Sequence, residues 1–497
     1  MTTDITIRWA DNLRCRIESD AGISYEIFEE FSFFVNGYKF MPLFKAGRWD
    51  GKLKMYDIKK RLFYIGLLPR LIEWADANGY SISFEDKSKF KESDIYDPAQ
   101  VDDIFKTAIY QPKWYQRKAV EYALKNGKVL TLSPTASGKS LMIYYLIRYV
   151  LEHTEDRILI SVPSKSLVEQ LYSDFEKYSA DGWQASDHVN RLHGERKDKN
   201  PHARVLLTTW QSVYKREAEF FENFDTYICD EAHSADGKSI SGIVEKLKHA
   251  PRRYGFTGTL DGSMMHELEM LARFGTLHRV VTTKELMDDG DVSNLLIDAY
   301  ILKYSEEECK LLKSADYQQE INFLVGHKER NKILASLALA AEGNTIMLFN
   351  FIEKHGELLY NILKPACEKI GKKLYYIHGA TDVDDRETIR QLLEKNDNCI
   401  LLASFGTFSV GVSVNNLHNA IFCHPYKATI RTLQSIGRIL RLAAGKHNAK
   451  LIDIGDQLTY TSKSGKTKAN TVFKHFISRL EIYQKEKFKY RIIEKTV

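Results

Sequence analysis

The sequence predicts an α/β protein in which two tandem parallel-sheet units follow a small α+β domain. From about residue 105 onward, short runs rich in Val, Ile, Leu and Tyr alternate with longer amphipathic stretches, the order expected of βαβ units. Residues 1–92 instead carry alternating, aromatic-rich segments such as 31–40 and 62–67. The 497 residues suffice for roughly two to four domains of ordinary size.

The first α/β unit is expected over 93–286, after a polar and charged stretch that ends the amino-terminal domain. A helix over 138–153 should follow its first strand. The strands are nearly continuous apolar runs, which is typical of parallel strands covered on both faces. The predicted strands are 128–132, 157–162, 205–209, 226–229 and 253–257.

The second α/β unit is expected over 287–497 and begins in a stretch of linker composition, 286–294. A strand over 295–304 and a closing amphipathic helix over 472–488 are predicted for this unit. Its other predicted strands are 344–349, 373–378, 399–404, 420–423 and 450–454.

The composition excludes several classes of protein. Hydrophobic residues are 44% and charged residues 28%, which is ordinary globular usage and argues against collagen-like or wholly disordered chains. Six cysteines form no Cys-x-x-Cys pair, so neither a disulfide framework nor a structural zinc is expected. With no leader pattern and no run of about 18 apolar residues, we expect a cytoplasmic protein with no membrane partner.

A phosphate-binding loop is predicted at Ser133-Pro-Thr-Ala-Ser-Gly-Lys-Ser140, between a strand and a helix. Backbone N–H groups at the helix start would hold the phosphates of ATP, Lys139 would add a positive charge, and Ser140 would help to bind Mg²⁺. Ser133 replaces the usual first glycine, and Ala136 stands where related loops often have glycine, so a stiffer loop is expected. The predicted nucleotide contacts are Thr135, Ala136, Ser137, Gly138, Lys139 and Ser140.

Two acidic residues follow the predicted strand 226–229 in the sequence Asp230-Glu-Ala-His233. Open α/β sheets bind ligands at the carboxyl ends of their strands. Asp230 is therefore predicted to bind Mg²⁺, and Glu231 to orient or deprotonate the water that attacks ATP.

These motifs resemble those of the superfamily 2 nucleic-acid helicases, and the resemblance covers roughly residues 105–460. It implies two RecA-like domains, adenine recognition by Gln116, and strand contacts by Ser164, Lys165, Thr208 and Thr209. Residues 257–259 resemble motif III, and 405–411 with Val412 and Ser413 resemble motif V. Residues 434–441 resemble motif VI, which implies catalytic roles for Gln434 and for arginine fingers at Arg438 and Arg441. Because these arginines are three residues apart, we expect them on one helical face.

The amino-terminal domain carries a local excess of positive charge. Residues 36–72 contain nine Lys or Arg against Asp50 and Asp57, a density suited to contacts with phosphates. Interleaved aromatic residues are candidates for base stacking, although most are expected in the core of so small a domain. The residues predicted to contact nucleic acid are Lys52, Lys54, Lys59, Lys60 and Arg61.

This domain, with Arg48-Trp-Asp-Gly-Lys52, and the segments 327–331 and 435–441 resemble the UvsW-type recombination helicases of tailed bacteriophages. The resemblance implies ATP-driven remodelling of branched DNA: Holliday-junction branch migration, fork regression, and unwinding of R-loops and D-loops in recombination, repair and replication. Expected partners are branched and double-stranded DNA, RNA–DNA hybrids and single-stranded DNA. Asp261-Gly-Ser263 lacks the Arg-Glu-Asp signature of similar transcription-repair helicases.

Two other functions stay open at this point. An RNA helicase would share the fold, but Gln434 stands where the DEAD-box group usually carries His. A DNA-binding or annealing scaffold without ATPase activity is the second alternative. The catalytic residue types at Lys139, Asp230, Glu231 and the two arginines argue against it.

Overall fold

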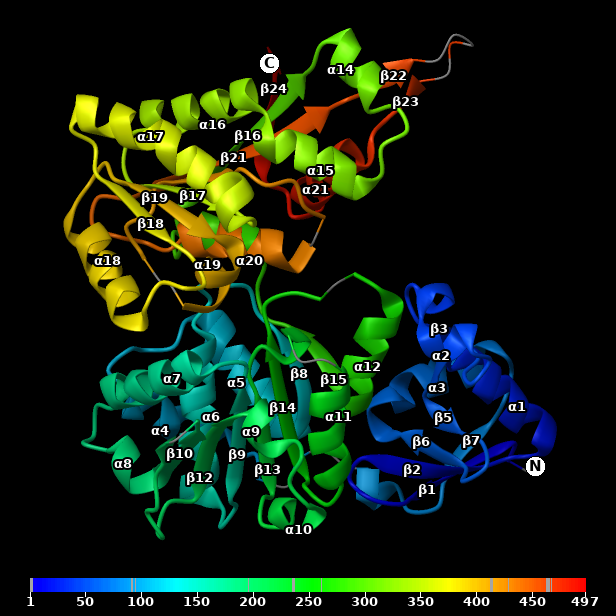
Figure 1. Ribbon diagram of the computed structural model, residues 1–497. Helices are drawn as coiled ribbons and strands as arrows, with labels where there is room; N and C mark the ends of the chain where they lie inside the picture. Colours follow the sequence, from blue (N-terminus) through cyan, green and yellow to red (C-terminus); the bar gives the residue numbers. More distant parts are fainter. Residues whose placement is uncertain are drawn as a thin grey trace. The chain divides into compact units, whose positions relative to one another are not determined.

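The computed structural model forms two compact units. The first contains Met1–Ser133 and Gly138–Val280, and the second contains Pro134–Ser137 and Val281–Val497. Figure 1 shows the elements of each unit. The structure describes residues 3–90, 93, 95–194, 196–234, 237–260, 262–411, 414–427, 429–461, 465 and 467–497. Within these residues, no helix has the length and apolar character needed to cross a membrane.

The amino-terminal domain is built on a five-stranded sheet of order β5-β6-β2-β1-β7, in which only the β1–β7 pair is parallel. A second, two-stranded sheet joins β3 to β4. This mixture of short strands and helices confirms the predicted α+β character. The strands are β1 Ile5–Trp9, β2 Arg14–Glu18, β3 Ser32–Phe34, β4 Lys52–Lys54, β5 Tyr56–Asp57, β6 Leu62–Tyr64 and β7 Ile82–Phe84, and the helices are α1 Ala21–Glu30, η1 Tyr38–Phe40, α2 Pro42–Lys45, η2 Ile65–Leu67, α3 Leu68–Ala77 and η3 Lys87–Phe90.

An eight-stranded sheet follows, with order β11-β10-β12-β9-β13-β14-β8-β15. Every residue of β9, β13 and β14 is buried, because helices cover both faces of these central strands. The five predicted strands are confirmed, whereas β10, β11 and β15 were not predicted. The strands are β8 Lys128–Leu132, β9 Ile158–Val162, β10 Val189–His193, β11 Arg196–Lys197, β12 Val205–Thr209, β13 Thr226–Cys229, β14 Arg252–Thr257 and β15 Thr276–Arg279.

The predicted helix over 138–153 is confirmed as α6, Lys139–His153. The helices around this sheet are α4 Pro98–Ile104, η4 Phe105–Thr107, α5 Trp114–Asn126, α6, α7 Lys165–Tyr178, α8 Ala185–His188, α9 Trp210–Val213, α10 Ala218–Phe221, η5 Ala232–Ser234, α11 Gly237–Lys246 and α12 Met264–Phe274.

The second unit contains a seven-stranded parallel sheet of order β18-β19-β17-β20-β21-β16-β24. The six predicted strands are present, and the predicted closing helix is α21, Thr471–Lys485. The sequence did not predict β24, Lys489–Thr496, which adds in parallel to β16 at the sheet edge. The strands are β16 Asn294–Lys303, β17 Thr345–Phe349, β18 Leu374–Ile377, β19 Ile400–Ser404, β20 Asn419–Phe422, β21 Asn448–Gln457, a small pair β22 Tyr460–Thr461 and β23 Thr467–Lys468, and β24.

Two buried arginine–aspartate pairs hold the carboxyl-terminal part of this unit together. Arg330 donates to both carboxylate oxygens of Asp456 and to the Cys423 carbonyl, and Arg479 donates to Asp453. The helices of the unit are α13 Thr283–Asp288, α14 Glu306–Leu311, α15 Tyr317–Gly326, α16 Lys328–Ala340, η6 Ile352–Gly356, α17 Glu357–Ile370, α18 Val383–Lys395, α19 Phe405–Gly411, α20 Thr429–Ile439 and α21.

The amino-terminal domain is fixed to the eight-stranded sheet through its β1–β2 turn. The buried Arg253 guanidinium donates to the Asn12 carbonyl (2.6 Å) and to the Arg273 carbonyl (3.0 Å). The Asn12 side chain donates to the His249 carbonyl (2.6 Å), and its backbone N–H donates to the Lys248 carbonyl (2.8 Å). Because buried polar groups are costly to unpair, these bonds hold the two parts as one body.

Salt bridges and one close backbone approach extend this joint. Arg14 pairs with Glu245 (2.6 Å), and Arg70 pairs with Glu267 (2.8 Å). Gly66, in η2, lies so close to α12 that a Cβ atom there would overlap the Leu271 carbonyl oxygen. Only glycine therefore fits at this point of the joint.

Replacing Gly66 with Ala should lower the stability of the first unit by about 1–3 kcal/mol, the usual cost of overpacking. Thermal unfolding of the full chain, followed by circular dichroism, measures the loss. The matched control is Gly326→Ala, in helix α15, where a Cβ atom would meet nothing within 4 Å. Equal melting temperatures for the two variants would contradict a rigid joint at Gly66.

Candidate functional site

The predicted phosphate loop lies between the end of β8 and the start of α6. Ala136 and Gly138 adopt left-handed backbone conformations, with φ of +71° and +78°. The Ser137 hydroxyl donates to the Pro134 carbonyl (2.7 Å), which closes the turn. The Ser133 N–H donates to the Thr257 carbonyl (2.9 Å), so the loop begins at a point held by the end of β14.

Four side chains connect this loop to the acidic segment after β13; we call them the Lys139–Thr257 network (Lys139, Glu231, His233 and Thr257). The Lys139 ammonium lies 3.7 Å from Glu231 Oε1 and 3.4 Å from the Ser133 carbonyl. Glu231 Oε2 lies 3.4 Å from His233 Nδ1, which is 2.7 Å from Thr257 Oγ1. The predicted catalytic lysine and glutamate are thus brought together in one unit.

The proton position on His233 follows from its partners. The Thr257 hydroxyl donates to the Thr259 carbonyl (2.9 Å), so its oxygen accepts from His233 and the imidazole carries its proton on Nδ1. Burial lowers the pKa of His233 below its usual value, against the opposing effect of Glu231. The ring is therefore neutral at pH 7 and acts as a hydrogen-bond donor.

Asp230 lies beside this network, and its pKa is raised above the usual value of an aspartate. Burial and, to a smaller extent, the neighbouring Glu231 carboxylate raise the pKa of Asp230 to about 7, against the opposing effect of Lys139. Two adjacent carboxylates with few compensating charges favour the binding of a cation. Across the described residues, no group of three or more His, Cys, Asp or Glu side chains forms a metal cage, so any metal here needs further oxygen ligands.

Backbone strain is concentrated at the same site. Five non-glycine residues of the described chain have positive φ, and Ala136 and Glu231 (φ +50°) are two of them. Left-handed conformations cost non-glycine residues about 1–2 kcal/mol each, and such strain gathers at functional positions. The sequence indicated the substitution at Ala136 but not the strained backbone at Glu231.

Gln116 and Ser140 contact other groups in this structure. The side-chain oxygen Oε1 of Gln116 accepts from the Lys113 N–H (2.9 Å) at the start of α5, and its side-chain nitrogen Nε2 packs against Gly138 of the loop. The Ser140 hydroxyl forms a hydrogen bond with the Tyr178 hydroxyl (2.8 Å) from α7. Both residues are thus at the loop, and their ligand contacts stay predictions.

In the second unit, the predicted catalytic residues lie in and after α20. The Arg438 guanidinium is 5.4 Å from the centre of the Phe408 ring in α19, and Gln434 is half-buried on the same helix. The expectation that Arg438 and Arg441 share a helical face is wrong, because α20 ends at Ile439. Val412 and Ser413, assigned to motif V, lie outside the described residues, as does Asp261.

A buried lysine accounts for this early helix end. The Lys446 ammonium donates to the carbonyls of Ile439 (2.7 Å) and Arg441 (2.6 Å), and the Ser293 N–H donates to the Leu440 carbonyl (2.8 Å). The carbonyls at the helix end and just beyond it are thus satisfied by groups outside the helix, where the chain turns away.

The predicted strand contacts of the first unit differ in exposure. Ser164 caps α7 by accepting from the Leu167 N–H (3.3 Å), and Lys165 is the first residue of that helix. Thr208 and Thr209 are buried, and their hydroxyls bond the Leu192 carbonyl (2.6 Å) and the Ser212 hydroxyl (2.8 Å). Nucleic-acid contact by these four residues stays a prediction.

The basic residues of the amino-terminal domain form two groups. Lys52 and Lys54, on β4, pair with Glu29 (2.9 Å) and Asp50 (2.7 Å). Lys59, Lys60 and Arg61 are exposed in the turn between β5 and β6, where Arg61 has φ +55°. Within the described part of the chain, the three turn residues form no ion pair, so their charge is not neutralised locally.

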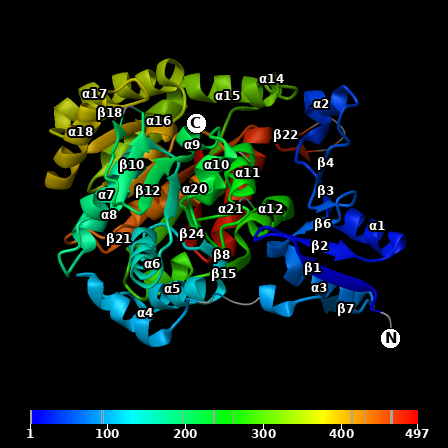
Figure 2. The same ribbon diagram turned by 90° about the horizontal axis from the view of Figure 1, so that it is seen from below.

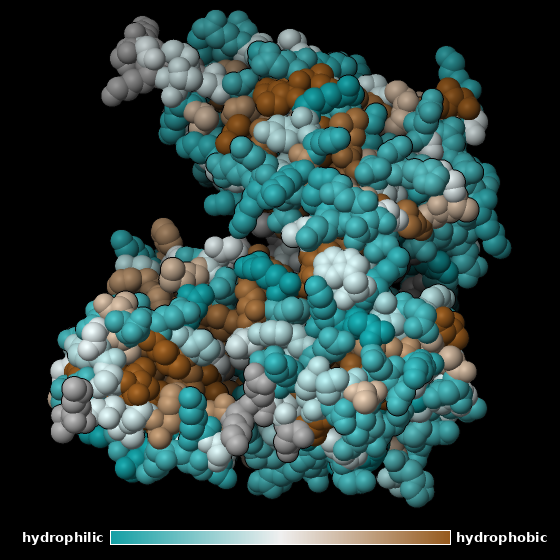
Figure 3. All heavy atoms as spheres, turned by 180° about the vertical axis from the view of Figure 1, so that it is seen from behind, coloured by the Kyte–Doolittle hydropathy of each residue, from teal (hydrophilic) through white to brown (hydrophobic). Residues whose placement is uncertain are grey.

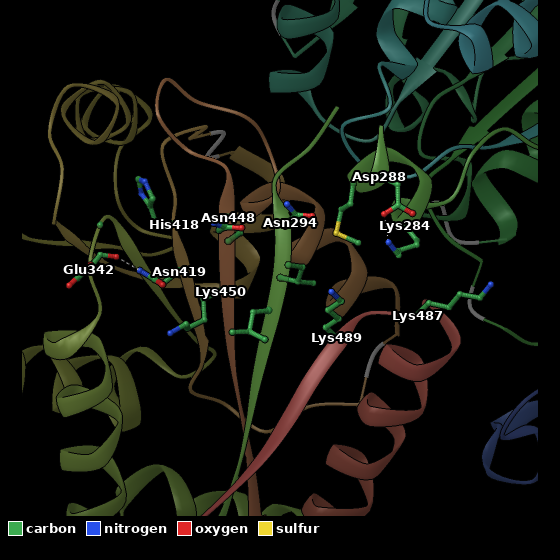
Figure 4. Close-up of a pocket in the computed structure, with 15 residues that line it drawn as sticks. Lys284, Asp288, Asn294, Glu342, His418, Asn419, Asn448, Lys450, Lys487 and Lys489 are labelled. Carbon is green, nitrogen blue, oxygen red and sulfur yellow. Dashed lines mark hydrogen bonds and ion pairs between the residues drawn. The ribbon is translucent and has the colours of Figure 1, made fainter. Parts of the chain in front are cut away.

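A cavity of about 890 Å³ opens in the second unit, at the amino ends of β16, β20, β21 and β24. Figure 4 shows Lys284 and Lys489 approaching the same part of the cavity near Asn294, while Lys487 points away from them. Lys284 is paired with Asp288. None of the predicted site residues lines this cavity, and its lysines do not converge on one point.

Three family models match: the amino-terminal domain of the DNA helicase UvsW at residues 4–85, the res subunit of type III restriction enzymes at 105–262, and the conserved carboxyl-terminal helicase domain at 329–443. The ATP-dependent DNA helicase uvsW of Enterobacteria phage T4 is 34% identical over 513 residues, covering 99% of each chain.

Solved structures agree with these matches. The crystal structure of T4 UvsW aligns with a TM-score of 0.53 at 31% identity, covering 99% of this chain and 100% of that one. The S. cerevisiae protein Dbp5, bound to RNA and ADP BeF3, aligns with a TM-score of 0.52 at 14% identity over 80% of this chain and 94% of its own. This second match shows a shared fold alone.

Replacing Ala136 with Gly should leave the ATPase rate within about twofold, because glycine adopts φ +71° without steric cost. Ala136→Val should lower the rate by about tenfold or more, because a β-branched residue is strongly disfavoured there. Steady-state ATP hydrolysis measures both variants, and melting temperatures control for folding. Equal rates for Gly and Val would show that the left-handed loop is not required.

Proposed function

The chain belongs to the UvsW helicase family, and on that premise we propose that it is an ATP-dependent DNA helicase that remodels branched DNA. The Lys139–Thr257 network is the observation that carries this proposal. It joins the phosphate loop, the acidic segment and the end of β14, the three parts that a nucleotide-driven motor must couple.

The residues fit ATP with Mg²⁺. Ser140 and Asp230 would hold Mg²⁺, because they offer the hard oxygen ligands that this ion takes from proteins when phosphates complete its shell. When bound, Mg²⁺ neutralises charge on the transferred phosphoryl group. A cation beside Asp230 would also relieve the repulsion from Glu231 that raises the Asp230 pKa.

Glu231 is the proposed base, and its availability is proposed to depend on the position of Lys139. In this structure the Lys139 ammonium faces Glu231 Oε1 at 3.7 Å. If Lys139 turns to the phosphates of ATP, the Glu231 carboxylate becomes available to orient and deprotonate water. The neutral His233 donates to Thr257 and lies 3.4 Å from Glu231 Oε2, so we propose that a change in the position of Glu231 affects motif III through this side chain.

The second unit is proposed to supply Gln434, Arg438 and Arg441 to the same reaction. Arginine fingers stabilise charge that develops on the phosphoryl group, worth about 10³- to 10⁵-fold in rate in comparable systems. Because Arg441 lies beyond the helix end, its reach depends on the turn that Lys446 holds.

The proposed substrates are branched and double-stranded DNA, with R-loops and D-loops as further substrates, and the proposed setting is the cytoplasm of the host cell. The roles that go with them are branch migration and fork regression in recombination, repair and replication. Family membership and the exposed basic turn at Lys59–Arg61 support DNA as the substrate.

ATPase measurements with different nucleic acids test the proposal. Rates are compared without nucleic acid and with single-stranded DNA, duplex DNA, a four-way junction and single-stranded RNA at one salt concentration. Stimulation greatest with DNA is expected. Stimulation by RNA alone would indicate an RNA helicase, and no hydrolysis under any condition would indicate a binding scaffold.

Glu231→Gln should reduce ATP turnover by about 10²- to 10⁴-fold while ATP still binds, because the water-activating carboxylate is lost and the metal ligand remains. Lys139→Ala should weaken both ATP binding and turnover. Nucleotide binding and single-turnover hydrolysis distinguish the two variants. Rapid turnover by Glu231→Gln would contradict the role assigned to this residue.

Replacing Lys59 and Lys60 with Gln should reduce the slope of log affinity against log salt by up to about 1.8 for duplex DNA, since each phosphate contact contributes about 0.9. Lys52→Gln with Lys54→Gln is the matched control and should change the slope less, because both lysines are already paired with acids. Equal changes in the two double variants would contradict the distinction.

A further inference from the structure

The segment between β3 and β4 exposes an unusual number of large apolar side chains. Phe40 is 81% exposed, Leu43 57% and Phe34 53%. We call Phe34, Tyr38, Phe40, Met41, Leu43 and Phe44 the aromatic tip. Figures 1 and 2 show β3 and α2, two of the elements that carry it, standing out from the five-stranded sheet. Exposed apolar clusters of this kind mark interaction sites.

The base of the aromatic tip is rigidly built. The Phe34 and Tyr38 rings stack with their centres 4.6 Å apart, and Tyr38 meets Phe44 edge-on at 4.8 Å. Gly51 lies so close that a Cβ atom there would overlap the Tyr38 ring, and its carbonyl accepts from the Val35 N–H (2.9 Å). Tyr38 is therefore locked in place.

Phe40 is held outward from this base. It closes the short η1 turn, in which its N–H donates to the Gly37 carbonyl (2.9 Å) and the Met41 N–H donates to the Tyr38 carbonyl (3.0 Å). In a flexible loop, an aromatic ring of this size would tend to fold back onto the domain. The hydrogen-bonded η1 turn instead holds the Phe40 ring in solvent. The ring is thus preorganised for a partner, which lowers the entropic cost of binding.

Positive charge surrounds the aromatic tip. Lys39, Lys45 and Arg48 form no ion pair within the described chain, and the Lys39 ammonium lies 5.8 Å from the centre of the Tyr38 ring. Lys52 and Lys54, at its foot, are compensated by acids. Figure 3 shows that, on the face it draws, the exposed hydrophobic side chains gather in separate patches within a mostly hydrophilic surface.

The exposed aromatic rings together with the unpaired cations indicate which kind of partner the aromatic tip binds. An apolar protein surface or a second copy of this chain would bury three unpaired cations, at high desolvation cost. A nucleic acid matches both features, because its phosphates pair with cations and its bases offer flat faces to aromatic rings. Intact duplex hides those faces, whereas a branch point exposes unpaired or terminal bases.

We propose that the aromatic tip binds the branch point of DNA and that Phe40 stacks on an exposed base there. The inference rests on the proposed function and identifies the part of the chain that recognises the branch. Because Gly66, Asn12 and Arg253 fix the amino-terminal domain to the eight-stranded sheet, the tip moves together with the nucleotide-binding unit.

The test measures DNA binding by the full chain without ATP. The DNAs are a fork with 2-aminopurine at the branch point and a blunt duplex of equal length. Phe40→Ala should weaken fork binding by about 5- to 150-fold, equivalent to roughly 1–3 kcal/mol for one stacked base. Duplex affinity should stay within about twofold, since the phosphate contacts remain.

Two control variants complete the test. Phe40→Trp should retain fork binding and the quenching of 2-aminopurine that Phe40→Ala loses. Tyr25→Ala removes another exposed aromatic ring, 58% exposed, from α1 of the same domain and should leave binding to both DNAs unchanged.

Equal losses on fork and duplex, unchanged fork binding by Phe40→Ala, or a change in self-association in place of DNA binding would each overturn the inference. Failure of the proposed function would appear separately, as a wild-type chain whose ATPase does not respond to DNA.

Discussion

The hydrogen-bonded contact between the ends of β8 and β14 is the constraint on which the rest of the site depends. The Ser133 N–H and the Thr257 carbonyl hold the two strand ends together, and the phosphate loop and motif III start from this point. From the next strand, β13, Glu231 reaches both Lys139 and His233. Lys139 of the loop is thereby connected to Thr257 through Glu231 and His233, and the backbone is left-handed at Ala136 and Glu231.

A second constraint fixes the amino-terminal domain to this machinery. Buried Arg253 belongs to β14, the same strand whose end carries Thr257, and it grips the Asn12 carbonyl of the amino-terminal domain. One strand therefore contacts the proposed nucleotide site at its carboxyl end and the amino-terminal domain near its amino end. In the proposed function, movement of the motor unit carries the aromatic tip and the basic turn with it.

The sequence predicted most of the fold because buried parallel strands leave a strong signal. The strands β8, β12 and β13 have the predicted bounds, since continuous apolar runs bounded by polar turns admit little else. Edge strands were missed for the opposite reason. Seven of the eight residues of β24 are exposed, and its charged sequence hides its pairing with β16. The position of each motif at the end of a predicted strand also indicated that Lys139, Asp230 and Glu231 would lie at the same edge of the sheet.

Features that depend on tertiary contacts could not be predicted. The end of α20 before Arg441 depends on the ammonium of Lys446, which approaches from a later turn. The burial of Thr208 depends on the neighbouring strand β10, which was itself missed. Phe40 is exposed and Tyr56 is buried, but no local sequence pattern distinguishes them. Packing decides which aromatic residues of a small domain enter the core.

The most direct test of the central claim is conversion of a mobile four-way DNA junction into duplex products, followed over time with ATP or a non-hydrolysable analogue. We expect conversion with ATP only, and none with the Glu231→Gln chain. Conversion that proceeds equally with the analogue, or hydrolysis of ATP on the junction without any conversion, would contradict it.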